Sequence, residues 1–200
     1  MTTPKVLLPL TTPPTDSPEA WSDAATAGRD AVAVIQLPLE SDTTALAAGI
    51  EALVRAGVEP LGHVSLAFAT RALPEVLHDI TRWAVLPVLG IFLDHAPASP
   101  YQIGPVVHAV RACRRCGLGT VVLNPGGPVD PVYRRLGVTI CTFEGSWSEY
   151  AATDPDEVAA GDGHLVFDVP RSQWDAARSL SHTRQAGLAL VTDRQIPRPR

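Results

Sequence analysis

Short apolar runs rich in valine, isoleucine and leucine recur about every 25 residues along the chain, and amphipathic helical patterns separate them. Apolar runs of this length are typical of parallel strands that are covered on both faces. Eight strands are predicted, and they cover Val6–Leu10, Ala31–Leu37, Pro60–Leu66, Gly90–His95, Thr120–Asn124, Val138–Phe143, His164–Val169 and Leu188–Val191. This alternation constrains the fold more than any other feature of the sequence.

The segments between the predicted strands carry the start and stop signals of helices. Ser17 and Pro18 suit a helix start, Gly57 and Gly117 suit helix ends, and Ser146 suits an N-cap. Helices are expected over Glu19–Ala27, Thr43–Ala56, Leu73–Trp83, Tyr101–Cys116, Pro131–Leu136, Ser146–Tyr150 and Ser172–Gln185. The proline-rich tail after Ile196 is unsuited to a final helix.

This alternation of strands and helices predicts one domain over residues 1–200, a compact (βα)8 barrel of the TIM type that lacks its final helix. An open, doubly wound sheet is the alternative. Such sheets commonly bind nucleotides through a glycine-rich turn, but no G-x-G-x-x-G motif or P-loop follows any predicted strand. The barrel is therefore the expected architecture.

Composition and charge exclude several classes of partner. The net charge is -5, and no basic cluster with interleaved aromatic residues is present, so nucleic acid is not expected as a partner. No apolar stretch is long enough to span a bilayer, and the first apolar run is too short for a signal sequence, so a cytoplasmic location is expected. Three cysteines are too few for a disulfide scaffold. The oligomeric state is left open.

Neither a cofactor nor a metal ion is expected. Lys5 is the only lysine and stands at the start of the first predicted strand, so Schiff-base and pyridoxal phosphate chemistry lack a nucleophile near the expected site. The spacing typical of metal ligands is absent from the scattered residues His63, His78, His108, His164 and His182.

Polar side chains follow the predicted strands at their carboxyl ends, which converge on one mouth of a barrel. The candidates to line this mouth are Thr11, Gln36, Ser65, Asp94, His95, Asn124, Glu144, Asp168 and Asp193. Asp94 and Glu144 follow the fourth and sixth strands, and a pair of carboxyl groups across a mouth is what glycoside hydrolysis requires. A capping role for Asp94 is the structural alternative.

His95 is a third catalytic candidate, because histidine titrates near neutral pH and can act as a general acid or base. The alternative is an outward side chain, since successive residues of a strand face opposite ways. Trp147 is a candidate to stack on a sugar ring, as is Phe68. Arg194 is a candidate to bind a carboxylate or phosphate group, although a solvated arginine is the simpler interpretation.

Several motifs together resemble the spherulin-4 family. They are Val6-Leu-Leu-Pro-Leu10, Leu61-Gly-His-Val64, Gly90-Ile-Phe-Leu-Asp94, Val121-Val-Leu-Asn-Pro-Gly126, Phe143-Glu-Gly-Ser-Trp147 and Val191-Thr-Asp193. The resemblance implies a (βα)8-type barrel and an activity similar to that of endo-acting glycosidases, which cut α-1,4-linked galactosamine-rich polysaccharide. It also implies that Asp94 and Glu144 match family acids and that Asn124 matches the asparagine of the fifth strand.

The chain departs from the family pattern mainly at the mouth. His95 stands where the family has a second acid, Ser65 where it has a histidine, and Thr11 where it has a tyrosine. Gln36 falls within the altered N-P element of the second strand, and Arg194 replaces the last acid of a T-D-D element. The changes at His95 and Arg194 remove negative charge, which does not suit a polycationic amino-sugar polymer.

Three hypotheses follow for the function. The first is a glycoside hydrolase that uses Asp94 and Glu144. The second is an intracellular isomerase, cyclase or lyase that moves protons with His95 and Glu144 on a small molecule. The third is a non-catalytic barrel that binds a ligand. The expected ligand is therefore a carbohydrate or another small molecule.

Overall fold

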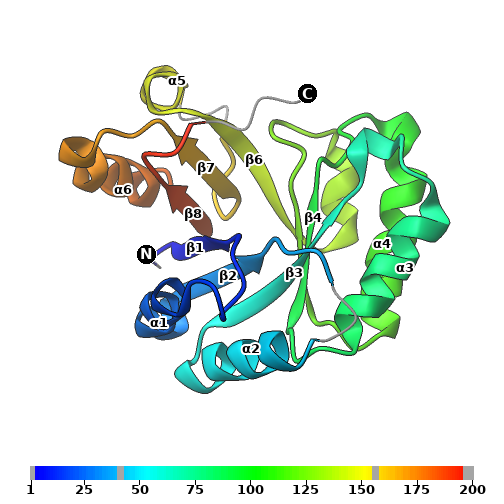
Figure 1. Ribbon diagram of the computed structural model, residues 1–200. Coiled ribbons are helices and arrows are strands. Elements are labelled where there is room, and N and C mark those ends of the chain that lie inside the picture. Colours follow the sequence, from blue (N-terminus) through cyan, green and yellow to red (C-terminus); the bar gives the residue numbers. More distant parts are fainter. Residues whose placement is uncertain (1–2, 40–42, 155–157, 196–200) are drawn as a thin grey trace.

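The computed structural model describes residues 3–39, 43–154 and 158–195, in which eight parallel strands close into a barrel in chain order (Figure 1). The strands are β1 (Lys5–Leu10), β2 (Ala31–Ile35), β3 (Glu59–Ser65), β4 (Gly90–Asp94), β5 (Thr120–Leu123), β6 (Thr139–Ser146), β7 (Gly163–Phe167) and β8 (Leu188–Val191). Strand β8 pairs with β1 and completes the ring. The predicted (βα)8 barrel is confirmed, and the open sheet is excluded.

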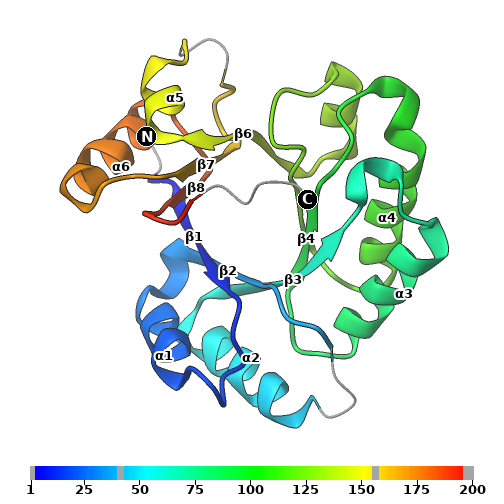
Figure 2. The same cartoon turned by 45° about the horizontal axis from the view of Figure 1, so that its top comes forward.

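The helices lie outside the ring of strands, as the two views of the molecule show (Figures 1 and 2). They are α1 (Pro18–Thr26), α2 (Thr44–Ala56), α3 (Leu73–Ala84), α4 (Ile103–Arg115), α5 (Trp147–Ala152) and α6 (Trp174–Thr183). Each of the longer helices buries one apolar face: α2, for example, buries Leu46, Ile50 and Leu53 against the barrel and ends at Gly57, whose φ of 90° favours glycine.

The structure places the ends of several strands and helices at other residues than the sequence predicts. Strand β2 ends at Ile35 rather than Leu37 because its partner β1 ends at Leu10. The segment Pro131–Leu136 is a 3-10 helix rather than an α-helix. The predicted helices at Tyr101 and Ser172 each begin with a 3-10 turn before the α-helix starts. Strand β6 runs on to Ser146, so that Glu144 lies inside the strand rather than after it.

Alternate residues of the strands fill the interior of the barrel. They form one apolar cluster of Leu7, Val32, Val34, Leu61, Phe92, Val122, Cys141, Leu165, Phe167, Leu188 and Leu190. A second, larger cluster packs the outer faces of β1 to β6 against the helices. The barrel interior is therefore filled by side chains, and the cavity that holds the candidate site opens toward the carboxyl ends of the strands.

Two further predictions concern the end of the chain and the position of Lys5. Strand β8 is the last element of the described chain, and the proline-rich tail for which no final helix was predicted, residues 196–200, lies outside the described residues. Lys5 pairs with Glu59 at 2.8 Å at the amino ends of the strands, opposite the predicted mouth.

Across the described segments, no helix has the length and apolar character needed to cross a membrane.

Candidate active site

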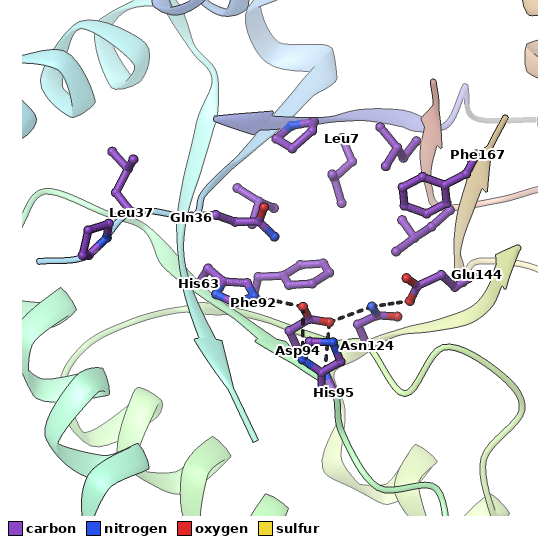
Figure 3. A pocket seen from close by; sticks show the side chains of 15 residues that line it. Leu7, Gln36, Leu37, His63, Phe92, Asp94, His95, Asn124, Glu144 and Phe167 are labelled. Carbon is purple, nitrogen blue, oxygen red and sulfur yellow. Dashed lines mark hydrogen bonds and ion pairs between the residues drawn. The ribbon is translucent and has the colours of Figure 1, made fainter. Parts of the chain in front are cut away.

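A cavity of about 530 Å³ opens at the carboxyl ends of the strands (Figure 3). Five of the predicted site residues line it, namely Gln36, Asp94, His95, Asn124 and Glu144. The other lining residues are Leu7, Pro9, Val34, Leu37, Pro38, His63, Phe92, Leu165, Phe167 and Leu190. The cavity has the size of an ordinary small-ligand site.

Strand periodicity places most of the polar residues in this cavity. Phe92 faces the barrel interior, so Asp94, two residues further along β4, faces the same way. The same step from Val122 on β5 brings Asn124 into the cavity. Toward the carboxyl ends of the strands, the apolar interior cluster is thus followed by a layer of polar side chains.

Glu144 reaches the cavity only because β6 contains a β-bulge. The register between β6 and β7 shifts between Cys141 and Phe143, where two steps on β6 match one step on β7. Cys141 faces the interior below the bulge, whereas Phe143 packs outside against Tyr150. Regular alternation from Cys141 would have turned Glu144 outward, and the extra residue reverses its direction.

His95 also lines the cavity, although it directly follows the inward-facing Asp94. Its φ of 49° is left-handed, so the chain leaves the strand conformation at this residue, and the alternation of faces no longer applies. The side chain is 47% exposed, and its Nδ1 lies 3.1 Å from Ser65 Oγ and 3.7 Å from Asp94 Oδ2. The inward alternative for His95 is therefore the one that the fold adopts.

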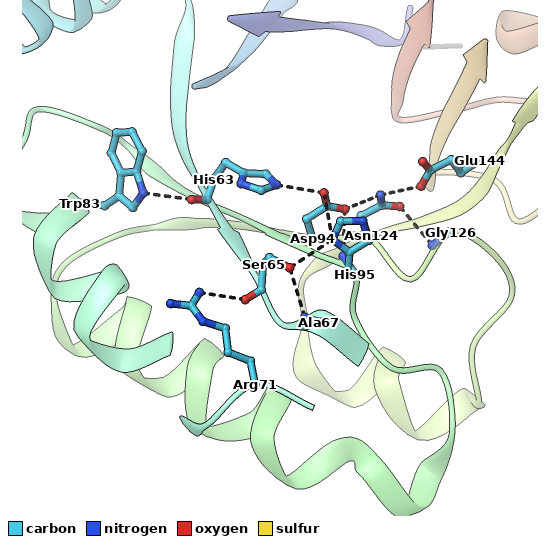
Figure 4. A network of polar contacts seen from close by, with 10 residues as sticks. All are labelled: His63, Ser65, Ala67, Arg71, Trp83, Asp94, His95, Asn124, Gly126 and Glu144. Atoms are coloured by element: carbon cyan, nitrogen blue, oxygen red, sulfur yellow. Dashed lines mark hydrogen bonds and ion pairs between the residues drawn. The ribbon is translucent and has the colours of Figure 1, made fainter. Parts of the chain in front are cut away.

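Asn124 connects the two acids (Figure 4). Its Nδ2 donates one hydrogen bond to Asp94 Oδ1 and one to Glu144 Oε2, each 2.8 Å long. The main-chain N–H of Gly126 donates to Asn124 Oδ1 at 3.2 Å, which fixes the amide with its NH2 group toward the carboxyl groups. Strand β5 lies between β4 and β6 in the ring, so the asparagine stands between the acids.

His63 is a member of the site that the sequence analysis did not single out. Its Nε2 lies 2.9 Å from Asp94 Oδ2, and its ring stacks on Phe92. Trp83 Nε1 donates to the main-chain oxygen of His63 at 3.0 Å and holds this part of β3 in place. The alternation of strand faces could have identified this residue, because His63 stands two residues after Leu61, which faces the barrel interior.

The environments of the two acids displace their pKa values in opposite directions. Burial alone would raise the pKa of Asp94, but the hydrogen bond and charge of His63, the charge of His95 and the bond from Asn124 outweigh it, so the pKa is lowered. Burial raises the pKa of Glu144, the charge of Asp94 adds to this, and the Asn124 bond offsets it only in part. The two pKa values are thus moved apart, with that of Asp94 below its ordinary value and that of Glu144 above its own.

The remaining predicted residues lie around the rim and outside the cavity lining. Ser65 contacts His95 and also accepts a hydrogen bond from the Ala67 main chain. Asp193 forms an ion pair with Arg171 at 2.9 Å. The others are Thr11 and Asp168, which are exposed, Trp147, which is hydrogen-bonded to Gln173, and Arg194, whose main-chain oxygen accepts a bond from Asp168.

The ionisable groups of the cavity are not arranged as a metal site. In residues 3–39, 43–154 and 158–195, no three histidine, cysteine or acidic side chains are grouped so that they could hold an ion. The acid pair, Asn124 and the two histidines therefore supply the reactive groups of this cavity: two carboxyl groups whose pKa values are displaced in opposite directions, an amide and two imidazoles.

Several solved TIM-barrel structures share this architecture. The crystal structure of Aspergillus clavatus Sph3 in complex with GalNAc has a TM-score of 0.77 and 21% sequence identity, and the match covers 95% of this chain and 88% of that one. DHDPS from Cyanidioschyzon merolae, solved with lysine bound, has a TM-score of 0.52 and 16% identity, with 94% and 70% covered. The 3-dehydroquinate dehydratase of Aquifex aeolicus also has a TM-score of 0.52, with 11% identity and 94% and 88% covered. These similarities establish the fold.

Comparison of the sequence with known proteins identifies the family as well as the fold. Spherulin-4 of Physarum polycephalum is 31% identical over 158 residues, which cover 72% of this chain. The chain spans about half the length of that relative, 46%. Residues 5–196 match the family described as spherulation-specific family 4. The resemblance drawn from the motifs is confirmed, and the chain belongs to spherulation-specific family 4, the spherulin-4 family.

Proposed function

We propose that this barrel is a glycoside hydrolase that uses Glu144 and Asp94 as its acid pair. The observation that carries the proposal is the shared Asn124 amide, which joins two carboxyl groups whose pKa values are displaced in opposite directions. A pair of carboxyl groups with different protonation at one pH is the arrangement that glycoside hydrolysis uses.

The directions of the two pKa shifts assign a role to each acid. Glu144, whose pKa is raised, donates a proton to the leaving glycosidic oxygen. Asp94, held as a carboxylate by its three hydrogen bonds, attacks the anomeric carbon on the other side. The bonded oxygens of the two acids both lie 2.8 Å from one nitrogen, so they lie within twice that distance of each other. This spacing favours the retaining mechanism, for which about 5 to 5.5 Å is typical.

The comparisons support an amino sugar as the substrate. The structural neighbour Sph3 was solved with GalNAc, and the family resemblance implies α-1,4-linked galactosamine-rich chains. Oligomers of α-1,4-linked N-acetylgalactosamine are therefore the substrate to test first.

The test is release of new reducing ends from these oligomers by the purified protein. Glu144→Gln and Asp94→Asn should each lower the rate by about 100-fold or more, because each removes one half of the acid pair. Glu51→Gln is the control, since Glu51 is an exposed helix residue paired with Arg55. The proposal fails if the wild type releases no reducing ends, or if Glu144→Gln keeps the wild-type rate.

A second candidate is proton transfer on a small molecule by His95 and Glu144. It is favoured by the cavity lining, in which nine of the fifteen side chains are apolar, and by the position of His95 in that lining. Replacing His95 by glutamine distinguishes the two candidates. Hydrolysis through the acid pair should survive His95→Gln with a modest loss of rate, whereas a proton-transfer reaction that uses the imidazole should be abolished.

A further inference from the structure

The rim of the cavity beside β3 and β4 carries an exposed aromatic pair. Phe68 is 47% exposed, and its ring centroid lies 5.4 Å from that of His95. His95 is exposed as well, and it lines the cavity next to Asp94. Phe68 is not among the lining residues, so it stands one side chain further from the acid pair than His95 does. The two rings therefore extend the site outward from Asp94.

The backbone holds Phe68 in a conformation that side chains disfavour. The consecutive residues Ala67, Phe68 and Ala69 have φ angles of 44°, 52° and 66°. Left-handed backbone is uncommon for residues other than glycine, and it is a clear outlier for a bulky side chain. Across the described residues only three further non-glycine residues are left-handed, and His95 is one of them. Strain of this kind concentrates at ligand sites, where the surroundings fix it.

Hydrogen bonds on both sides tie this turn to the site. The main-chain N–H of Phe68 donates to the main-chain oxygen of His95 at 2.6 Å. Gln102, in the 3-10 turn before α4, donates from Nε2 to the main-chain oxygen of Phe68 at 3.5 Å. The Phe68 ring is therefore fixed on the rim while much of its surface stays open to solvent.

The imidazole of His95 adds a polar group beside the ring of Phe68. Ser65 Oγ accepts a hydrogen bond from the main chain of Ala67 and lies 3.1 Å from His95 Nδ1, so its own hydrogen can be donated to Nδ1 (Figure 4). The neutral imidazole then carries its hydrogen on Nε2, for which no described residue is a hydrogen-bond partner. An apolar ring face next to a hydrogen-bond donor suits a pyranose ring, which has C–H groups on one face and oxygen atoms around its edge.

We propose that Phe68 and His95 form a second sugar-binding subsite on the rim. A pyranose ring of the substrate stacks its C–H face on Phe68 and accepts a hydrogen bond from His95 Nε2, while the bond to be cleaved lies at Asp94 and Glu144. The proposal rests on the proposed function for the position of that bond. It implies that the protein selects oligosaccharides over single sugars, because only a ligand of several rings reaches both the acids and Phe68.

The subsite is tested by calorimetry on the Glu144→Gln variant with three probes: methyl N-acetyl-α-galactosaminide and the α-1,4-linked dimer and trimer of N-acetylgalactosamine. The trimer should bind more tightly than the methyl glycoside. Adding Phe68→Asn should lower the affinity for the trimer about 3- to 10-fold, the effect of one aromatic stacking contact, and should leave the methyl glycoside unaffected. Asparagine tolerates left-handed backbone, so the unfolding temperature should not fall, and Phe68→Tyr should keep the affinity for the trimer.

Leu89→Ala is the control, because Leu89 is 44% exposed but directly precedes β4, at the amino ends of the strands. The subsite is overturned if Phe68→Asn binds the trimer as tightly as its parent, if Leu89→Ala causes the same loss, or if none of the three probes binds. Failure of the hydrolase is a separate result. Loss of trimer binding in Phe68→Asn without any cleavage by the wild type would support the subsite and reject the hydrolase, and cleavage with unchanged trimer binding in Phe68→Asn would do the reverse.

Discussion

His63 Nε2 lies 2.9 Å from Asp94 Oδ2, and the two side chains come from the adjacent parallel strands β3 and β4. The other oxygen of Asp94 accepts hydrogen bonds from the His95 main chain and from Asn124. Every strong partner of this carboxylate is a donor, so the site stabilises its ionised form. His63 supplies both a hydrogen bond and charge to that stabilisation.

Replacing His63 by phenylalanine should shift the acid limb of the pH–rate profile to higher pH. The hydrogen bond and charge of His63 lower the pKa of Asp94, so their loss raises it, and Asp94 becomes protonated earlier as the pH falls. The profile of kcat/KM measured on a hydrolysed oligomer reports this shift. His78→Phe, at an exposed position of α3, is the control, and an unchanged acid limb in His63→Phe would exclude the proposed role.

Removing the shared amide should weaken catalysis without unfolding the barrel. Asn124→Ala deletes one hydrogen bond to each acid, and both bonds lower the pKa of their acceptors, so the pKa values of Asp94 and Glu144 should both rise. A loss of about 10- to 100-fold in kcat is expected from two charge-assisted bonds. Steady-state rates together with thermal unfolding separate this effect from instability. A variant with wild-type kcat would show that Asn124 does not position the acids.

The bond geometry also predicts the stereochemistry of hydrolysis. The spacing of Asp94 and Glu144 favours retention, so the first product of an α-linked oligomer should be the α anomer. Proton NMR of the anomeric region during the first minutes of the reaction, before mutarotation, identifies the anomer. Early appearance of the β anomer would instead require a water between the acids and would rule out direct attack by Asp94.

A buried histidine outside the site makes stability depend on pH. His164 on β7 is fully buried, and its Nδ1 lies 2.8 Å from Tyr150 Oη. Burial lowers the pKa of His164 to about 4, and the charge of Arg184 contributes to this, while Asp162 opposes it. Because the folded pKa lies below the unfolded value of about 6.5, stability is complete above pH 6.5 and declines as the pH falls toward 4.

The decline from this histidine should amount to roughly 3 kcal/mol of unfolding free energy. Urea unfolding at pH 7 and pH 4 measures it. In His164→Gln the residue no longer titrates, so the difference between the two pH values should shrink, whereas His78→Gln should keep it. A difference that is the same in wild type and His164→Gln would assign the acid sensitivity to other groups.

The fold could be predicted from the sequence because each strand and helix carries its own local sequence signal. Apolar runs mark the strands, and their number and alternation with helices indicate a closed ring. Asp94 and Asn124 could be predicted as site residues for the same reason, since both follow apolar runs at strand ends. The bounds of the 3-10 turns could not be predicted, because such turns share their local sequence signals with the first turn of an α-helix.

The arrangement of the site depends on features that a linear pattern does not contain. The direction of Glu144 is set by the bulge in β6, which is a property of the pairing with β7. The direction of His95 is set by its left-handed backbone. The role of His63 depends on its diagonal contact with Asp94 on the neighbouring strand, which requires the register between β3 and β4.

The central claim is that the pKa values of Asp94 and Glu144 are displaced in opposite directions, and the chain offers a direct probe of this separation. Asn124 is the only asparagine in the sequence, so protein labelled with 15N-asparagine gives a single pair of side-chain NH2 signals from the group that bonds both acids. A pH titration should show two separate steps in these signals, one below the ordinary Asp value of 3.8 and one above the ordinary Glu value of 4.5. In Glu144→Gln only the lower step should remain. A single shared step, or loss of the lower step in Glu144→Gln, would contradict the division of roles between Asp94 and Glu144.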